Sequence, residues 1–591
     1  MIPSRVPPPT DVLTLELSDQ LKQRTEGLLT RLIKTNLCTR YVRESPIFSD
    51  FLRAIENSCS PAATDAGHNT NEILNETLLE AYRTTIPLST YDSYKPFVNK
   101  FLERPCKHDE VKDLFAPGLP YFIAESSGTS GNSAKIFAKY RHPPGTSASP
   151  QGLGGKVCGV YSLTHQHVVE VQGADAETLT RFPVCLSSTG TIRMLHGMDI
   201  ERDPSTLNLT MPNATSPVAV CHIRNYRSFL LMHVLFALAD ARLQVMYTLF
   251  STVFLDIVAY MEEEWNTLVD SIEKGELPDY EGIDHVREYI EPKFHPQPSR
   301  ASELRAIGPA SGNPGWLAKI WPELKVIVCV ASGVFATVIP KMRHYLGPDM
   351  LMHSLGYVAS ECWVGTVYDP YDLNLFKATH DDIVEYLDVS LEETAASLIS
   401  AWNVVTGHKY EVVVTTRDGM WRYRLGDIVE IAGFDPRDGT PVLKFVERRN
   451  LAMLSLTYPM TSEKQLTDAI FDIQDTLGQV AEFTVVVDDR VMPRRFGYLV
   501  EVQDTVGPTA DLACGKLREA LCLSNPGVKH ALEEGMLGNP TIRILRPGTF
   551  SEFRKWKVEL ANTGAGQIKV PVVLWDPVAQ EWMFERVIQE V

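Results

Sequence analysis

The chain of 591 residues lacks the features that define several whole classes of protein. Its ten cysteines contain no CxxC pair and no repeated spacing, which argues against both a structural zinc site and a disulfide scaffold. It also lacks an excess of basic residues: the formal net charge is −18, whereas dedicated nucleic-acid-binding proteins usually present a basic face. We therefore expect reduced thiols, no nucleic acid as partner, and a small molecule as the ligand.

No segment is both long and apolar enough to suggest a membrane span. The most apolar stretch, residues 229–260, contains Asp240, Arg242, Gln244 and Asp256, which interrupt the uncharged run that a bilayer needs. The N-terminus has no basic region followed by an apolar core, so it does not resemble a secretory signal. We expect a cytoplasmic monomer with no membrane partner, and one or two buried helices at 229–260.

What the sequence does contain is an alternation of helical and strand patterns. Apolar residues recur at helical spacing over 12–58 and again from about 222 to 274. Two short β-branched runs, 326–330 and 411–416, are typical of strands buried on both faces. The alternation predicts an α/β fold.

A smaller unit is distinguishable at the C-terminal end. A helix is predicted over 462–478, where Ser462 and Gln465 have the spacing of a capping box. Two strand patterns and another helical pattern follow it, at 482–489, 498–504 and 510–522. We therefore divide the chain into an N-terminal domain, residues 1–458, and a small α+β C-terminal domain, residues 459–591.

One loop, 126-SSGTSGNSAK-135, has the composition of an anion-binding site. Small residues leave backbone N–H groups exposed, hydroxyls add donors, and Lys135 adds a positive charge. The loop does not match the Walker phosphate loop, because three residues separate Gly131 from the lysine and Ile136 replaces the required serine or threonine. By itself it could equally be a solvent-exposed turn.

Two further motifs carry acidic residues. In 356-GYVASECWVG-365, Glu361 could act as an oxygen ligand of Mg²⁺, or it could simply be the acid at a helix N-terminus. In 421-WRYRLGDIVEI-431, Asp427 could accept hydrogen bonds from both hydroxyls of a ribose. The alternative is that Asp427 pairs with Arg422 or Arg424 inside a hairpin.

Taken in this order, the three motifs resemble those of the plant auxin-responsive acyl-acid amido synthetases, the Gretchen Hagen family, a branch of the firefly-luciferase-like adenylate-forming superfamily. The run 410-YEVVVTT-416 with 422-RYRLGD-427 is the most specific part, and similar stretches extend over nearly the whole chain. The resemblance implies a large N-terminal adenylate-forming domain, with β-sheets flanked by helices, and a small mobile α+β C-terminal domain.

The resemblance also implies an activity. Enzymes of this family use Mg-ATP to convert a carboxylic acid into an acyl-adenylate, release pyrophosphate, and transfer the acyl group to an amine, usually that of an amino acid. The cofactors would be ATP and Mg²⁺, and the substrates a small-molecule acid and an amine. The C-terminal domain rotates between the two steps, bringing a lysine onto the α-phosphate in the first.

Mapped onto this sequence, the resemblance assigns roles to single residues. The phosphates would be held by Ser126, Ser127, Gly128, Thr129, Ser130 and Lys135. Glu361 would hold Mg²⁺, and Ser360 would lie near the α-phosphate. Tyr357 and Gly333 would line the adenine slot, Asp427 would bind the ribose, and Arg448 would lie nearby. Lys569, in 566-GQIKVP-571, would be the lysine of the C-terminal domain, although it could also be an ordinary surface lysine.

Departures from the plant pattern leave part of the function open. Val334 replaces a usual serine, 451–463 lacks the family's aspartate and lysine, and the loop 141–156 is longer than in plant sequences. An acyl-CoA ligase and a non-catalytic nucleotide-binding protein therefore remain alternatives. The apolar stretch 229–260 and Phe335 suggest a hydrophobic or aromatic acid, and an acid of microbial or fungal secondary metabolism is as reasonable an expectation as a plant hormone.

Overall fold

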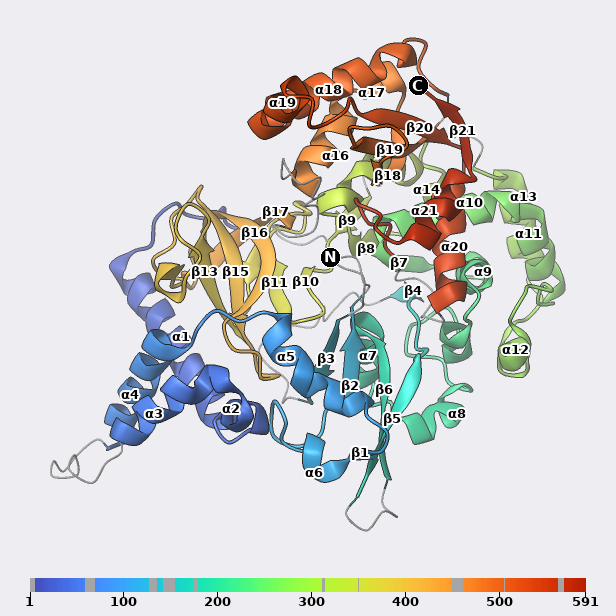
Figure 1. The fold of residues 1–591 in the computed structure, drawn as a ribbon. Helices are drawn as coiled ribbons and strands as arrows, with labels where there is room; N and C mark the ends of the chain where they lie inside the picture. The colour runs from blue at the N-terminus through green and yellow to red at the C-terminus, as the bar shows by residue number, and fades with distance from the viewer. Residues whose placement is uncertain are drawn as a thin grey trace.

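The computed structural model describes residues 6–58, 70–126, 135–141, 155–173, 179–310, 314–348, 350–448, 461–503, 505–561 and 568–591. Four sheets flanked by helices make up the described part of the chain (Figure 1). The predicted α/β class is therefore confirmed.

Helices form the N-terminal part of the chain, as the spacing over 12–58 predicts. They are α1 (Leu15–Asn36), α2 (Arg40–Glu44), α3 (Ser49–Ser58), α4 (Thr70–Thr85) and α5 (Tyr91–Val98). Their apolar faces pack on the largest sheet, where the Trp421 ring lies 5.3 Å from the ring of Phe48 and 5.6 Å from that of Phe51. This aromatic cluster joins the helical layer to the sheet that carries several of the predicted site residues.

The largest sheet has eight strands in the order β10-β11-β12-β17-β16-β15-β13-β14, all antiparallel. The predicted strand at 411–416 belongs to β15 and is confirmed. Every residue of β15 except Lys409 is buried. The strands are β10 (Tyr357–Val358), β11 (Trp363–Val367), β12 (Phe376–Ala378), β13 (Ile383–Asp388), β14 (Leu398–Ile399), β15 (Lys409–Thr415), β16 (Tyr423–Phe434) and β17 (Pro441–Arg448).

A five-stranded mixed sheet has the order β1-β5-β6-β2-β3. It contains the hairpin of β2 (Phe122–Glu125) and β3 (Ile136–Lys139), whose connection is the predicted phosphate loop. The other strands and the nearby helices are β1 (Cys106–Lys107), β5 (His167–Gln172), β6 (Leu179–Leu186), α6 (His108–Val111), α7 (Ser187–Leu195) and α8 (Asp203–Thr206).

A four-stranded sheet, in the order β4-β7-β8-β9, is entirely parallel. Its strands are β4 (Lys156–Val160), β7 (Leu243–Phe250), β8 (Val326–Val330) and β9 (Leu351–His353), so the strand predicted at 326–330 is confirmed. The helices of this unit are α9 (Tyr226–Ala239), α10 (Ser251–Glu263), α11 (Trp265–Lys274), α12 (Asp284–Ile290), α13 (Pro298–Ile307), α14 (Trp316–Ile320) and α15 (Ile339–Leu346).

Two helices, α9 and α10, do lie within 222–274, but the helical pattern predicted over this range is wrong in its middle. Helix α9 ends before Asp240, and the next apolar run forms strand β7 rather than more helix. A strand inside a parallel sheet is apolar on both faces, so periodicity alone cannot distinguish it from a segment of buried helix. The correction matters because β7 lies between β4 and β8 and leads directly into α10.

The C-terminal sheet has the order β18-β19-β20-β21, with β19 and β20 parallel and the other pairs antiparallel. The capping box at the start of α16 is confirmed. The Ser462 side chain accepts a hydrogen bond from the backbone N–H of Gln465, and the Gln465 side chain accepts one from the backbone N–H of Ser462. The elements are α16 (Glu463–Asp472), α17 (Gln474–Leu477), β18 (Val480–Asp488), β19 (Arg495–Val502), α18 (Ala513–Ser524), α19 (Pro526–Glu533), β20 (Thr541–Leu545), α20 (Thr549–Ala561), α21 (Pro577–Phe584) and β21 (Val587–Glu590).

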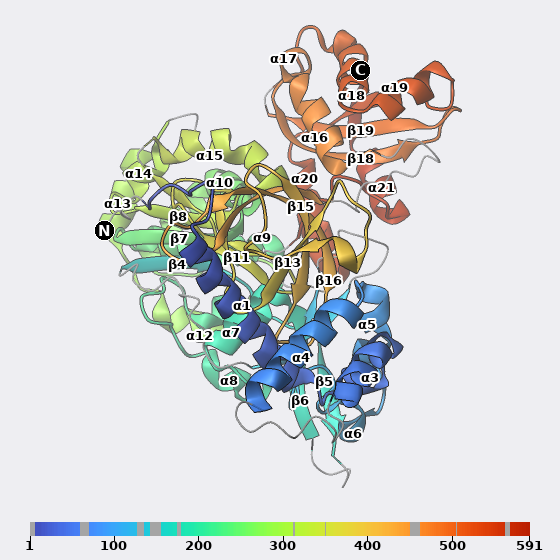
Figure 2. The ribbon, with the colours of Figure 1, turned by 90° about the vertical axis from the view of Figure 1, so that its left-hand side faces the viewer.

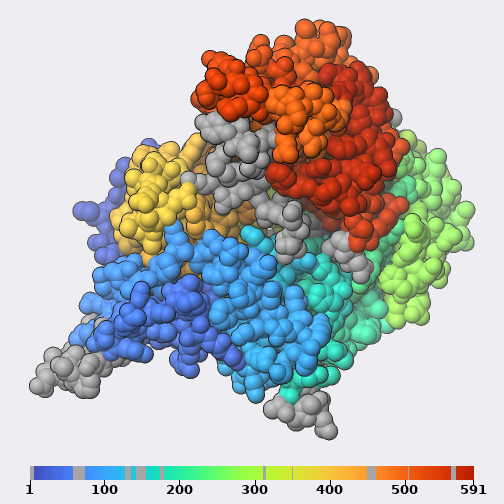
Figure 3. All heavy atoms as spheres, in the orientation of Figure 1, coloured from blue at the N-terminus to red at the C-terminus, as the bar shows by residue number. Residues whose placement is uncertain are grey.

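The C-terminal unit lies against the rest of the molecule rather than apart from it. In the space-filling view its red part abuts the green part of the chain (Figure 3), and α20 lies beside α9 and α10 in the ribbon (Figure 1). The turned view shows the same unit at the upper right, with α15 of the parallel-sheet unit to its left (Figure 2). The predicted boundary at 458/459 lies outside the described residues and stays a prediction.

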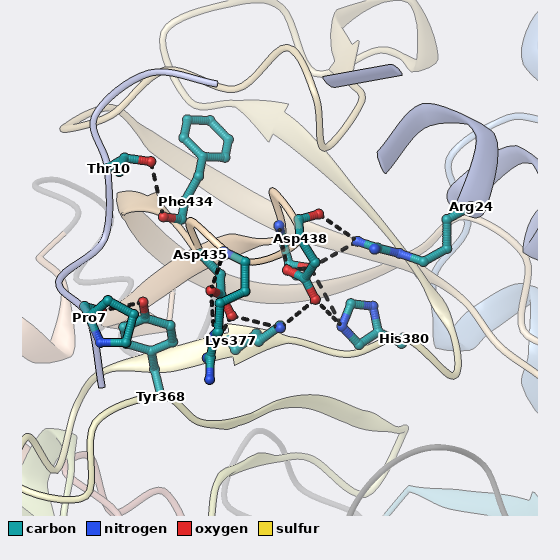
Figure 4. A network of polar contacts seen from close by, with 11 residues as sticks. Pro7, Thr10, Arg24, Tyr368, Lys377, His380, Phe434, Asp435 and Asp438 are labelled. Carbon is teal, nitrogen blue, oxygen red and sulfur yellow. Dashed lines mark hydrogen bonds and ion pairs between the residues drawn. The ribbon is translucent and has the colours of Figure 1, made fainter. Parts of the chain in front are cut away.

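A polar network attaches Pro7 and Thr10 to the eight-stranded sheet (Figure 4). Lys377 Nζ lies 2.7 Å from an Asp435 carboxylate oxygen and 2.6 Å from one of Asp438. The backbone N–H of Thr10 donates to the carbonyl of Phe434 at 2.9 Å. These contacts hold the β16–β17 turn and thereby support the two strands that carry part of the site.

Within the described ranges, no helix combines the length and the apolar character needed to cross a membrane. The nine cysteines in those ranges are free thiols.

Candidate active site

One cavity of about 2140 Å³ contains the predicted site residues. It is lined by the parallel sheet, the eight-stranded sheet and the C-terminal unit. Nine of the predicted residues line it: Ser126, Lys135, Gly333, Tyr357, Ser360, Glu361, Asp427, Arg448 and Lys569. The other four, Ser127, Gly128, Thr129 and Ser130, lie outside the described residues. The structure thus brings together residues that are spread over more than 400 positions of the sequence, while the role of each stays a prediction.

The base of the phosphate loop is closed by two hydrogen bonds. The Ser126 N–H donates to the carbonyl of Lys135 at 2.7 Å, and the Lys135 N–H donates to Ser126 Oγ at 2.9 Å. Both residues extend the β2–β3 hairpin, so the pairing of these strands places the loop at the cavity. The Lys135 ammonium lies 5.7 Å from the centre of the Tyr91 ring, a cation–π distance that keeps the charge at the cavity edge.

Asp427 is the centre of a buried polar group. It lies directly opposite Arg448 across β16 and β17, and only 4 % of its surface is exposed. One carboxylate oxygen accepts from Arg448 Nε at 2.5 Å, and the other accepts from the Tyr357 hydroxyl at 2.8 Å. The Asp427 charge raises the pKa of the Arg448 guanidinium, and burial raises the pKa of the Tyr357 phenol well above its ordinary value. Asp427 is therefore held by two donors that fix its orientation.

The alternative pairing of Asp427 with Arg422 or Arg424 is wrong. Arg424 forms two hydrogen bonds with Glu411, at 2.8 and 2.6 Å. Arg422 pairs instead with Glu385, at 3.1 and 3.2 Å. Both arginines are thus held by other carboxylates, and Asp427 faces the cavity.

Glu361 lies in the turn between β10 and β11, so the alternative of an acid at a helix N-terminus is wrong. Its backbone carbonyl accepts a hydrogen bond from Lys139 Nζ, which also pairs with Asp418 at 3.3 Å. The side chain is buried and lines the cavity. No described residue donates a hydrogen bond to its carboxylate or forms an ion pair with it. A buried carboxylate in this situation fits an oxygen ligand of Mg²⁺.

Lys569 lies in the cavity, not on the outer surface. Its ammonium is 5.0 Å from the centre of the Phe250 ring and 5.6 Å from that of Phe335. These two rings stack with centres 4.6 Å apart and planes 11° apart. Burial lowers the pKa of Lys569 to about 8, and the charge of Arg448 acts in the same direction. The stacked rings thus form a platform over which the lysine of the C-terminal unit lies.

The sequence analysis missed Glu463. It is the first residue of α16, directly after the N-cap Ser462, and it lines the cavity close to Lys569 and Arg448. Burial raises the pKa of its carboxyl group to about 7. The capping box predicted the start of the helix, but only the packing of the C-terminal unit brings that helix end to the cavity.

The parallel sheet forms an apolar wall of the same cavity. Because side chains alternate along a strand, one set faces the helices and the other faces the cavity. The wall includes Val157, Gly159, Val245, Tyr247 and Val328. Gly333, at the end of this wall, has φ of 59°, a left-handed conformation that glycine adopts readily. The cavity thus combines a charged end with an apolar side.

Comparison with known proteins finds similar chains of about the same length. Indole-3-acetic acid-amido synthetase GH3.8 of Oryza sativa subsp. indica is 26 % identical over 546 residues, which cover 86 % of this chain and 85 % of that protein. Jasmonoyl--L-amino acid synthetase GH3.5 of Oryza sativa subsp. japonica is 25 % identical over 528 residues, covering 83 % and 86 %. A solved structure of AtGH3.15 acyl acid amido synthetase in complex with 2,4-DB shares the fold, with a TM-score of 0.72, 20 % identity, and coverage of 97 % and 96 %.

Family models match along most of the sequence. The GH3 family N-terminal domain matches residues 16–351, the central domain residues 378–448, and the C-terminal domain residues 464–577. The resemblance inferred from the three motifs is confirmed, and the chain belongs to the GH3 family.

Proposed function

We propose that this chain is an ATP-dependent acyl-acid amido synthetase that joins a hydrophobic carboxylic acid to the amine of an amino acid. Membership of the GH3 family supports this, as do relatives named as amido synthetases for indole-3-acetic acid and jasmonate. The observation that carries the proposal is the convergence of Glu361, Asp427, Lys135 and Lys569 on one cavity with an apolar wall.

In the first step, a carboxylate oxygen of the acid attacks the α-phosphorus of ATP. A new phosphorus–oxygen bond forms, the bond to the β-phosphate breaks, and pyrophosphate leaves. Such a reaction needs positioning and charge neutralisation more than covalent participation of the protein. Asp427, held by Tyr357 and Arg448, would accept hydrogen bonds from the ribose hydroxyls. Lys135 and the hydroxyl loop would hold the departing phosphates, and Lys569 would offset charge on the α-phosphate.

Glu361 would hold Mg²⁺, which when bound neutralises charge on the phosphate oxygens. The residues present suit this role, because the carboxylate is buried and faces the cavity, and no described side chain donates a hydrogen bond to it. Ser360 precedes it in the same turn and would lie near the α-phosphate.

In the second step, the nitrogen of the amine attacks the acyl carbon. The carbon–nitrogen bond forms, the bond to AMP breaks, and the amine loses a proton. The apolar wall of the parallel sheet would hold the body of the acid with its carboxyl group toward the charged end. This arrangement favours an acid with a large apolar group over a small or highly charged one.

The proposal is tested with the whole chain, ATP and MgCl₂. Pyrophosphate release is first measured over a panel that includes indole-3-acetate, jasmonate, substituted benzoates and medium-chain fatty acids. The best acid is then incubated with the 20 amino acids or with coenzyme A, and the products are identified by mass. Amides support the proposal. A coenzyme A thioester alone would make the chain an acyl-CoA ligase, and ATP binding without pyrophosphate release would make it a non-catalytic binding protein.

Three further expectations belong to the same proposal. We propose a cytoplasmic location because the described cysteines are free thiols, and a role in secondary metabolism because the acid need not be a plant hormone. We also propose a monomer, which light scattering coupled to size-exclusion chromatography would test.

A further inference from the structure

Helix α20 packs against two parts of the molecule at once. Phe550 and Phe553 belong to an apolar cluster of the C-terminal unit, together with residues of β18 and β19. Val558, one turn farther along the same helix, is buried in the core around α9 and α10. The ribbon shows α20 beside α9 and α10 (Figure 1). The helix therefore joins the C-terminal unit to the parallel-sheet unit.

A buried ion pair forms the polar part of this junction. Arg554 of α20 donates two hydrogen bonds to the carboxylate of Asp256 on α10, both at 2.7 Å. The Tyr226 hydroxyl donates to the same carboxylate at 2.6 Å. Only 3 % of the Arg554 side chain and 5 % of the Asp256 side chain are exposed. Two charges at this depth are stable only while paired, because each would otherwise be desolvated without compensation.

Arg554 is also connected to the segment that carries Lys569. Its remaining nitrogen pairs with Glu482 of β18 at 2.8 Å. Along the same strand, the Thr484 hydroxyl donates to the carbonyl of Pro571 at 2.8 Å. The Val485 N–H donates to the carbonyl of Val572 at 2.7 Å. Strand β18 therefore holds both Arg554 and the chain two and three residues after Lys569.

Helix α10, on the other side of the junction, is also connected to the surroundings of Lys569. Asp256 lies in the second turn of α10, and this helix begins immediately after Phe250. Phe250 and Phe335 are the rings over which Lys569 lies, and the Ser251 hydroxyl at the start of α10 donates to the carbonyl of Phe335 at 2.7 Å. Phe250 and Asp256 thus lie on one continuous stretch of chain, to which Phe335 is joined by the hydrogen bond from Ser251.

From this closed set of contacts we propose that Asp256 and Arg554 are positioning residues for the first half-reaction. Their pairing fixes the C-terminal unit so that Lys569 lies over Phe250 and Phe335, and it opens when the C-terminal unit leaves that arrangement for amide formation. This inference rests on the proposed function in assigning the first half-reaction to the arrangement seen here. The contact itself can be tested without any substrate.

The first test measures how accessible Lys569 is in the whole chain alone. Wild type and Asp256→Asn are treated with sulfo-NHS-acetate, and acetylation of Lys569 is followed by peptide mass spectrometry, with exposed Lys529 as the internal reference. We expect Lys569 in the variant to react roughly 5- to 30-fold faster, the factor by which one contact of ordinary strength shifts an equilibrium. Equal rates in wild type and variant would overturn the proposal.

A matched control separates positioning from general loss of stability. Asp488→Asn removes an equally buried carboxylate from its ion pair with Arg543, at 2.8 Å, inside the C-terminal unit. We expect the reactivity of Lys569 to stay unchanged in this control. Arg554→Lys, which keeps the positive charge, should retain part of the protection of Lys569 that Asp256→Asn loses. Faster labelling in Asp488→Asn as well would show that general destabilisation, not positioning, is responsible.

The second test separates the two half-reactions. With the best acid of the panel, acid-dependent exchange of labelled pyrophosphate into ATP reports adenylation, and amide formation from the supplied acyl-adenylate reports transfer. Asp256→Asn is expected to slow exchange about 10-fold or more while transfer stays within about 2-fold of wild type. Equal losses in both would overturn the inference. If wild type shows no exchange with any acid but the labelling result holds, the proposed function fails and the positioning contact stands.

Discussion

Replacing Lys569 with methionine is expected to stabilise the protein while abolishing adenylation. Methionine keeps much of the aliphatic length but carries no charge, so it can stay over the Phe250 and Phe335 rings. The pKa of Lys569 is lowered from 10.5 to about 8, mainly by burial. Keeping the ammonium charged in the folded protein therefore costs up to about 3 kcal/mol at neutral pH. Lys569→Met should regain up to that amount.

The pH dependence follows from the same shift. Below about pH 8 both the folded and the unfolded chain bind the proton, so the full destabilisation is present. As the pH rises from about 8 toward 10.5, the folded chain loses the proton first, and the difference between wild type and Lys569→Met shrinks. Urea unfolding at several pH values measures this difference. A variant less stable than wild type at pH 7 would refute the reasoning.

The adenylation activity of the wild type should fall over the pH range in which its stability recovers. A charged Lys569 attracts the α-phosphate and a neutral one does not, so kcat/KM for adenylation in wild type should fall as the pH rises through about 8. Glu463→Gln should move that fall to lower pH, because the Glu463 carboxylate raises the pKa of Lys569. Glu519→Gln, at an exposed position of α18, is the matched control. A pH profile that is flat through this range, or one unaffected by Glu463→Gln, would contradict the assignment.

Three other predictions concern single side chains. Asp427→Asn should weaken ATP binding roughly 10- to 100-fold, since a hydrogen bond to a charged group contributes about 1.5–3 kcal/mol; calorimetric titration showing unchanged affinity would exclude the ribose contact. Glu361→Gln should raise the Mg²⁺ concentration needed for half-maximal pyrophosphate release about 10-fold or more. An unchanged Mg²⁺ titration would show that Glu361 is not a ligand of the metal. Trp421→Ala should lower the free energy of unfolding in urea by about 3–5 kcal/mol, because the ring is buried against Phe48. Trp575→Ala, at a partly exposed position, should lower it far less. Similar values for the two variants would contradict the role of Trp421 in joining the N-terminal helices to the sheet.

The elements that the sequence predicted well are those with strong local signals. The Ser462–Gln465 capping box marks the start of α16 within one residue, and the β-branched runs mark β8 and β15. Strand β7 was mistaken for helix because its residues are apolar on both sides, which is the condition of any strand in the middle of a parallel sheet. Local pattern carries no information about which neighbour buries a given face.

The candidate site shows the same division. Asp427 and Glu361 could be singled out because each lies in a motif whose residue types suit phosphate and ribose chemistry. Glu463 carries no such motif, and it became a candidate only because α16 begins at the cavity. The pairing of Asp427 was also undecidable from sequence, since Arg422 and Arg424 are close in the chain but are held by other carboxylates.

By itself, the sequence determined the fold class, the family and the chemical character of the site, because composition, motif spacing and residue type are local properties that survive without coordinates. The tertiary structure alone decided which residues meet. Asp256 and Arg554 are 298 positions apart, and Lys569 reaches Phe250 from the other end of the chain. Such contacts depend on how whole elements pack, and at the Asp256–Arg554 junction the cost of burying either charge unpaired favours the packing in which the two meet.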